Sequence, residues 1–123
     1  MSALQALESD SLTEAMASPG ITRRIAFKSE DSVVLRSQSQ PGVVSGWHTH
    51  GDYDVYGYVV SGICRLESDQ GENDATTVSQ GGFLHVPPHT VHREINPSQK
   101  EENDVILFLR GSGQMVYNLD KKG

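Results

Sequence analysis

The chain has 123 residues, of which 36% are hydrophobic, and a formal net charge of −6, so it can form one globular domain around one core. The negative charge argues against a nucleic-acid partner, while the lack of a signal peptide and of any apolar run of roughly 18–20 residues argues against a membrane. The single cysteine, Cys64, excludes an intrachain disulfide, and we expect a cytoplasmic location.

Residues 1–20 are predicted to form an N-terminal arm that precedes the main domain. Leu4 and Leu7 lie three positions apart among good helix formers, which favours a short helix between residues 3 and 17. Ser18-Pro19-Gly20 would end such a helix. A charged, irregular arm is the alternative.

Residues 21–119 show the short alternating segments and frequent turn signals of an all-β protein. Strands are predicted where β-branched and aromatic residues alternate with polar ones between Gly, Pro and Asn. The predicted strands are 21–27, 32–36, 43–50, 54–61, 63–67, 76–78, 83–86, 91–95, 104–110 and 114–119. This pattern favours a β-sandwich or β-barrel domain over residues 21–119, followed by a polar tail at 120–123.

Histidines mark the candidate site. His48 and His50 are two positions apart on a predicted strand, so both side chains point to the same face. Asp54 follows closely, and His92 comes after a rigid Pro87-Pro88 turn that could return the chain to the same place. Imidazole and carboxylate ligands together suit a divalent first-row transition metal. The alternative is that these polar residues line a barrel mouth and hydrogen-bond to water.

Two segments around these histidines resemble the two signature motifs of the cupin superfamily. The first runs from Gly42 through His48-Thr49-His50 and Asp54 to Gly62, and the second runs from Gly81 through Pro87, His89 and His92 to Asn96. The resemblance implies a small single-domain protein of the conserved-barrel type, with a double-stranded β-helix, or jelly-roll barrel. It also implies that His48, His50, Asp54 and His92 bind a metal ion, and that the protein forms a homodimer.

The sequence departs from the cupin motifs at two positions. Asp54 stands where the first motif has glutamate, so its shorter side chain must start from a different backbone position or bind the metal through water. His89 stands where the second motif has glycine, usually with a positive φ. Histidine is among the few non-glycine residues enriched at such positions, so we expect the turn to be kept.

Several side chains near the motifs are candidates for a substrate pocket. Tyr56 and Tyr58 share strand parity with Asp54 and could donate a proton or hold an anion beside it. His85, Phe83 and Phe108 could line the same cavity. For the tyrosines and His85, ordinary packing or a satisfied hydrogen bond is the alternative, and for the two phenylalanines the alternative is the hydrophobic core.

Two arginines on the first predicted strands are a further candidate feature. The guanidinium groups of Arg23 and Arg36 could hold a carboxylate bidentately. A solvated strand face is the simpler interpretation, and we expect it for both.

The leading functional hypothesis is a metal-dependent enzyme that acts on a small organic molecule, with dioxygenase chemistry as the first expectation. An isomerase or lyase acting on a sugar or carboxylate is an alternative, as is a non-catalytic module that binds or senses a small ligand. Three imidazoles and one carboxylate would leave open positions on six-coordinate Fe, Mn or Ni, whereas Zn would prefer a nearly tetrahedral arrangement. The sequence does not choose among these metals.

Overall fold

The computed structural model describes residues 3–15, 18–71 and 73–119. The strands in this part of the chain are β1 (Thr13–Glu14), β2 (Ile21–Lys28), β3 (Ser32–Ser39), β4 (His48–Thr49), β5 (Asp54–Ser61), β6 (Ile63–Ser68), β7 (Ala75–Ser79), β8 (Phe83–Val86), β9 (His92–Ile95), β10 (Asn103–Arg110) and β11 (Tyr117–Asn118). One short 3-10 helix, η1 (Ser9–Ser11), precedes them. The described residues contain no helix long and apolar enough to cross a membrane. The polar tail predicted at 120–123 lies outside the described residues.

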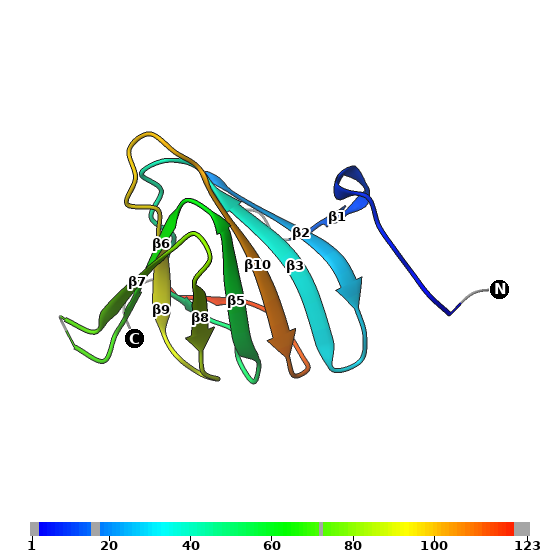
Figure 1. Ribbon diagram of the computed structural model, residues 1–123. Helices are drawn as coiled ribbons and strands as arrows, with labels where there is room; N and C mark the ends of the chain where they lie inside the picture. The colour runs from blue at the N-terminus through cyan, green and yellow to red at the C-terminus, as the bar shows by residue number, and fades with distance from the viewer. Residues whose placement is uncertain (1–2, 16–17, 72, 120–123) are drawn as a thin grey trace.

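The strands form two antiparallel sheets. One has the order β1-β2-β3-β10-β5-β8 and the other β11-β4-β9-β6-β7. In Figure 1 the two sheets form the walls of one barrel-like body, and the N-terminal segment extends away from it. This arrangement confirms the all-β, double-stranded β-helix prediction.

The N-terminal arm is mostly irregular, which is the second of the two predicted alternatives. Among its described residues only η1 is helical, and β1 pairs with β2 through Thr13↔Ile25 and Glu14↔Arg24. Leu4 is 88% exposed and Leu7 is 45% exposed, so no apolar stripe is buried that could stabilise a helix. Pairing with β2 supplies hydrogen-bond partners for the backbone of the arm. An isolated helix of this length would be only marginally stable in water. Residues 16–17 of the predicted helix lie outside the described residues.

Alternation along β3, β5 and the second half of β10 places one face of each strand inside the barrel. On β5, Val55, Gly57 and Val59 are buried, while the residues between them are exposed. The same alternation on β3 and β10 completes the hydrophobic core. The buried core residues are Val33, Leu35, Tyr53, Val55, Val59, Cys64, Leu66, Val86, Val105, Leu107 and Leu109.

Strand β4 is shorter than the predicted strand over 43–50. It contains only His48 and Thr49 and pairs with β9 at a single position, His48↔His92. Val44 makes an isolated bridge to Ile95 in place of a continuous ladder. The register of this short pair brings two distant histidines side by side.

Two tight turns follow the sequence expectation. Gly62 joins β5 to β6 with a φ of 81°, and a Cβ there would lie 2.7 Å from the carbonyl oxygen of Glu102. His89 has a φ of 58° and is the only non-glycine residue with positive φ in the described part of the chain. The turn after Pro88 is therefore kept, with histidine in the position that the cupin motif gives to glycine.

Candidate metal centre

Three histidines converge inside the barrel. His48 lies on β4, His50 follows that strand directly, and His92 begins β9. Their ring centroids are 4.4 Å apart for His48–His92 and 5.1 Å apart for the other two pairs. All three side chains are buried. The i and i+2 spacing and the His48↔His92 register together produce this convergence.

The backbone fixes the tautomer of each ring. Nδ1 of each histidine lies 2.9 Å from a carbonyl oxygen, which can only accept a hydrogen bond. The acceptors are Gly46 for His48, Met115 for His50 and Thr90 for His92. Each ring therefore donates through Nδ1–H and keeps a lone pair on Nε2.

The free Nε2 atoms are the chemical signature of the site. Nε2 of His48 and of His92 are buried and have no hydrogen-bond partner. A buried polar atom without a partner costs free energy, so proteins rarely leave one unless a ligand satisfies it. The observed orientation, with Nδ1 held by a carbonyl and Nε2 free, is one in which histidine commonly binds metals.

The carboxylate of this group comes from Glu94. Glu94 lies two positions after His92 on β9 and so points to the same face. One ligand atom from each of His48, His50, His92 and Glu94 lies within 4.8 Å of the others. Glu94 Oε1 is 3.8 Å from His48 Nε2, too far for a hydrogen bond. We call these four residues the His–Glu cluster.

Sequence reasoning missed Glu94, although the signal was present. The residues His92 and Glu94 have the same i and i+2 spacing on a predicted strand as His48 and His50. Applying the same parity rule to β9 would have found the carboxylate.

A buried arginine accompanies Glu94. Arg23 on β2 is only 5% exposed, which corrects the expectation of a solvated face. Its Nη2 is 3.8 Å from Glu94 Oε2, and its Nη1 donates to Ser18 Oγ at 3.1 Å. Burial disfavours the charged form of Glu94, but the positive charge that His48 would carry if protonated and the Arg23 guanidinium outweigh burial and lower the pKa of Glu94. Glu94 is therefore ionised.

The imidazoles of His50 and His92 are neutral at ordinary pH. Burial, followed by the positive charge that His92 would carry, lowers the pKa of His50 to about 4. Burial and the neighbouring His48 also lower the pKa of His92. Neutral imidazole is the form that binds a metal. The cluster thus offers neutral nitrogen donors beside an ionised carboxylate.

Asp54, the expected carboxylate ligand, lies outside the cluster. On β5 it has the parity opposite to the buried Val55, so its side chain points away from the barrel interior. Its Oδ1 is 2.8 Å from His85 Nε2, and both side chains are more than a third exposed. The prediction of Asp54 as a ligand is therefore corrected to Glu94. The cause is strand parity, which outweighs motif spacing here.

The predicted pocket residues share this outer position. Tyr56, Tyr58 and Phe108 are 45%, 40% and 40% exposed, and Phe83 is 76% exposed. Tyr56 stacks on His85 with centroids 4.7 Å apart, and Tyr58 lies 5.0 Å from Phe83. They line no cavity inside the barrel because they alternate with the buried residues of their strands. We call Tyr56, Tyr58, Phe83, His85 and Phe108 the outer aromatic face.

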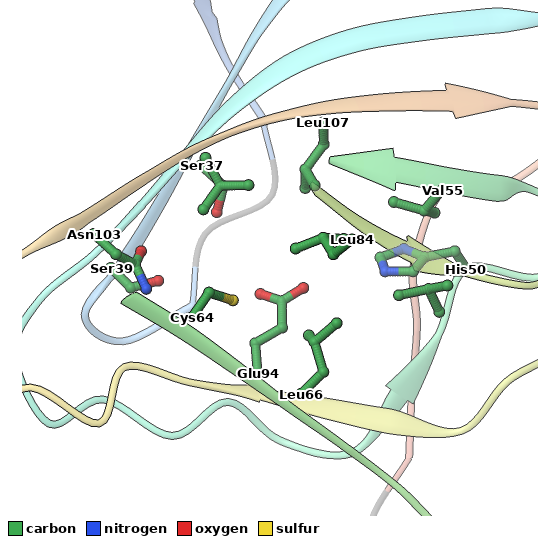
Figure 2. Close-up of a pocket in the computed structure, with 12 residues that line it drawn as sticks. Ser37, Ser39, His50, Val55, Cys64, Leu66, Leu84, Glu94, Asn103 and Leu107 are labelled. Atoms are coloured by element: carbon green, nitrogen blue, oxygen red, sulfur yellow. The ribbon is translucent and has the colours of Figure 1, made fainter. Parts of the chain in front are cut away.

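A small inner cavity lies next to the cluster. Its volume is about 20 Å³, room for about one water molecule. Figure 2 shows the Glu94 carboxylate pointing into it from one wall, with His50 on another side. The other walls are mainly aliphatic, with Ser37, Ser39, Cys64 and Asn103 as the polar ones. Burial and the Glu94 charge raise the pKa of the Cys64 thiol to about 12, so it stays protonated.

A second, larger hollow adjoins the cluster at His92. This outer cleft has a volume of about 180 Å³ and includes His92, His85, Thr90, Glu67 and Asp74 in its walls. Leu66 and Val86 line both the cleft and the inner cavity. His92 is the member of the His–Glu cluster that borders the cleft.

The family model for the cupin domain matches residues 35–109. The chain belongs to the cupin domain family. The matched range includes the whole His–Glu cluster of this cupin, whereas Arg23 precedes it. A comparison with curated proteins finds no significant match.

Solved structures share the fold of this cupin at low sequence identity. A double-stranded β-helix protein from Klebsiella pneumoniae is 19% identical, with a TM-score of 0.74 over 96% of this chain and 99% of that chain. A polyketide cyclase from Streptomyces resistomycificus is 13% identical, with a TM-score of 0.77 over 94% and 85%. An oxalate decarboxylase from Bacillus subtilis is 20% identical, with a TM-score of 0.70 over 85% of this chain and 29% of that chain. At these identities the comparison shows the fold alone.

Proposed function

We propose that this cupin is a divalent-metal-dependent enzyme that acts on a small organic molecule. The observation that carries the proposal is the pair of buried, unpartnered Nε2 atoms on His48 and His92, facing Glu94. Three neutral imidazoles and one carboxylate suit Fe(II), Mn(II) or Ni(II) and leave open coordination positions for a substrate. Four-coordinate Zn(II) would leave fewer.

Each residue of the cluster has a defined role in this proposal. The metal, when bound, supplies Lewis acidity or redox chemistry. His48, His50 and His92 would hold it through Nε2, and Glu94 through a carboxylate oxygen. The carbonyls that accept from Nδ1 keep the rings in place. The aliphatic walls of the inner cavity keep bulk water away from the site.

Dioxygenase chemistry is the first reaction to test. The inner cavity supports it, because its volume of about 20 Å³ suits a molecule of the size of water or dioxygen rather than an organic substrate. Its walls include Leu66, Leu84 and Leu107, which suit an apolar gas. The organic substrate would then occupy the outer cleft.

An isomerase or lyase acting on a sugar or carboxylate is the second candidate. It is favoured by the likeness to the oxalate decarboxylase of Bacillus subtilis, a protein with Mn(II) centres. In this chemistry the metal would polarise a carbonyl or carboxylate group as a Lewis acid. The cleft of about 180 Å³ at His92 has room for a small polar substrate.

Metal analysis is the first experiment. Protein purified without added metal is expected to carry or to take up about one divalent ion per chain. His48→Ala combined with His50→Ala should reduce the metal content to background. Asp54→Ala combined with His85→Ala is the matched control and should leave the metal content unchanged, since this pair lies on the outside. Unchanged metal in the first variant would show that the site assignment is wrong.

Turnover assays then separate the reaction classes. Fe(II)-loaded protein is tested for oxygen consumption with phenols, diketones and thiols, and Mn(II)-loaded protein is tested with small carboxylates and sugars. Oxygen uptake that requires the cluster supports the dioxygenase. Oxygen-independent conversion supports the isomerase or lyase. Stoichiometric binding without any conversion would instead indicate a binding or sensing protein.

We also propose a homodimer. The outer aromatic face supports it, because Phe83 is 76% exposed and Tyr58 and Phe108 are each 40% exposed on one sheet. Light scattering should give twice the chain mass, and Tyr58→Lys with Phe83→Lys should give the monomer. A wild-type monomer at micromolar concentration would contradict the proposal. The cytoplasmic location expected from the sequence stays a prediction.

A further inference from the structure

The charge balance around the His–Glu cluster sets a condition on what can bind there. Glu94 is mostly buried, with a side chain 16% exposed, and Arg23 is its cationic neighbour at 3.8 Å. The Arg23 side chain is 6% exposed, and its guanidinium also donates a hydrogen bond to the neutral hydroxyl of Ser18. Glu94 and Arg23 therefore balance each other inside the barrel before any metal is present.

A divalent ion in the cluster would change this balance. The three imidazoles are neutral ligands, and the negative charge of Glu94 is already offset by Arg23. The polar walls of the inner cavity, Ser37, Ser39, Cys64 and Asn103, are uncharged. The two positive charges of the ion would consequently remain uncompensated in a site shielded from water, where charges interact strongly.

We propose that Arg23 makes the metal-loaded site select an anionic ligand, a small carboxylate, at the open coordination positions. This inference rests on the proposed function and names its substrate class. Arg23 acts here as a positioning and charge-balancing residue, since it lies against Glu94 and not in the donor set. A neutral analogue of the same shape would leave the excess charge in place and bind weakly.

The route to the site does not oppose an anion. Glu67 is a carboxylate in the wall of the outer cleft, but Arg65 and Arg93 contact it at 3.1 and 2.8 Å and offset its charge. Asp74 is exposed and hydrogen-bonded to Ser68, so solvent ions screen it. A carboxylate entering the cleft would meet the cluster at His92.

The test measures ligand binding to the Co(II)-loaded protein rather than turnover. Acetate and acetamide have the same shape and differ in charge, and each is titrated while the visible Co(II) absorption and the heat of binding are followed. Acetate should bind at least about tenfold more tightly than acetamide. Arg23→Met should weaken acetate binding by about tenfold and leave acetamide binding unchanged, because one positive charge is removed near the ion. Arg23→Lys should retain most of the selectivity.

The affinity for the metal provides a second readout. If Arg23 acts through charge, Arg23→Met should bind Co(II) at least as tightly as the wild type, since a cation has been removed. A merely structural role predicts weaker Co(II) binding instead. Arg36→Met is the matched control: Arg36 makes a bidentate pair with Asp104 through bonds of 2.9 and 2.6 Å, away from the cluster. Arg36→Met should change neither the affinity for Co(II) nor the affinity for acetate.

The outcomes distinguish this inference from the function on which it rests. A wild-type protein that binds no Co(II) contradicts both. A protein that binds Co(II) but takes acetate and acetamide equally well overturns the inference alone. Should Arg23→Met fail to fold, Arg23→Lys and the wild-type comparison of acetate with acetamide still decide it.

Discussion

Two histidine–carboxylate groups on this barrel differ in almost every physical respect. In the His–Glu cluster the side chains are buried, and two Nε2 atoms have no partner. In the Asp54–His85 pair the side chains are 36% and 47% exposed and satisfy each other at 2.8 Å. The same residue types therefore form a candidate metal centre in one place and a hydrogen-bonded surface pair in the other.

Strand parity accounts for the difference. Asp54 precedes the buried Val55 on β5 and so faces outward, whereas Glu94 follows His92 by two positions on β9 and faces inward. A residue's distance from the His-x-His segment along the chain does not decide whether it reaches the site. The face of the strand on which the residue lies decides whether its side chain reaches the site.

Replacing Glu94 and, separately, Asp54 by the corresponding amide should give the largest difference between the His–Glu cluster and the Asp54–His85 pair. Glu94→Gln removes a charged ligand and should weaken Mn(II) or Co(II) binding by about 100-fold. It also leaves Arg23 buried without its counterion, which should lower the free energy of unfolding by about 3 kcal/mol. Metal titration and urea unfolding measure the two effects.

Asp54→Asn is the matched control for Glu94→Gln. It should leave the metal affinity within about twofold of the wild type, because Asp54 is on the outer surface. If Asp54→Asn weakened metal binding as much as Glu94→Gln, the assignment of the carboxylate to Glu94 would be wrong.

Acidification should destabilise the metal-free protein through the buried histidines. The pKa of His50 is lowered from 6.5 to about 4. Between these two pH values His50 binds a proton in the unfolded chain but not in the folded protein. The contribution of a neutral His50 to the free energy of unfolding is fully present above about pH 6.5. It is lost as the pH falls toward 4, which lowers the free energy of unfolding by about 3 kcal/mol. His92, whose pKa is lowered in the same direction, adds to the loss.

Urea unfolding at pH 7.5, 5.5 and 4.5 measures this loss. His50→Asn is the reference variant, because the other titrating groups are common to both proteins and cancel in the difference. The variant should show a shallower decline than the wild type. Parallel declines would mean that His50 is accessible to protons in the folded protein.

Deleting the exposed pair should have the smallest effect. Asp54→Ala, His85→Ala and the double variant form a thermodynamic cycle for a hydrogen-bonded pair at the surface. We expect a coupling free energy below about 1 kcal/mol from urea unfolding at low salt, decreasing further at high salt. A coupling of several kcal/mol would place this pair in the same energetic class as the buried cluster.

The sequence predicted the barrel well, because alternation at period two is a direct physical signal. The bounds of β5, β8 and β10 agree with the predicted strands to within one residue. Strand β4 was overestimated because Val43–Trp47 has the composition of a strand, yet only Val44 makes a bridge there. Composition does not reveal which residues pair in a regular strand ladder.

The candidate site was predicted only in part. His48, His50 and His92 were singled out, and the structure brings their rings together. The carboxylate was assigned to Asp54 because family spacing was given more weight than the parity of β5. Arg23 could not be assigned from local pattern, since its contact with Glu94 joins β2 to a strand of the other sheet.

One long-range contact ties the site to the end of the described chain. The Nδ1–H of His50 donates to the carbonyl of Met115, and β11 pairs with β4 immediately beyond. The donor geometry is therefore completed only after the last strand has docked. During synthesis, a chain released from the ribosome only as far as β10 would have all four donor residues but no acceptor to orient the His50 ring. If the cluster binds a metal as proposed, high-affinity uptake would be a late event in the maturation of this protein.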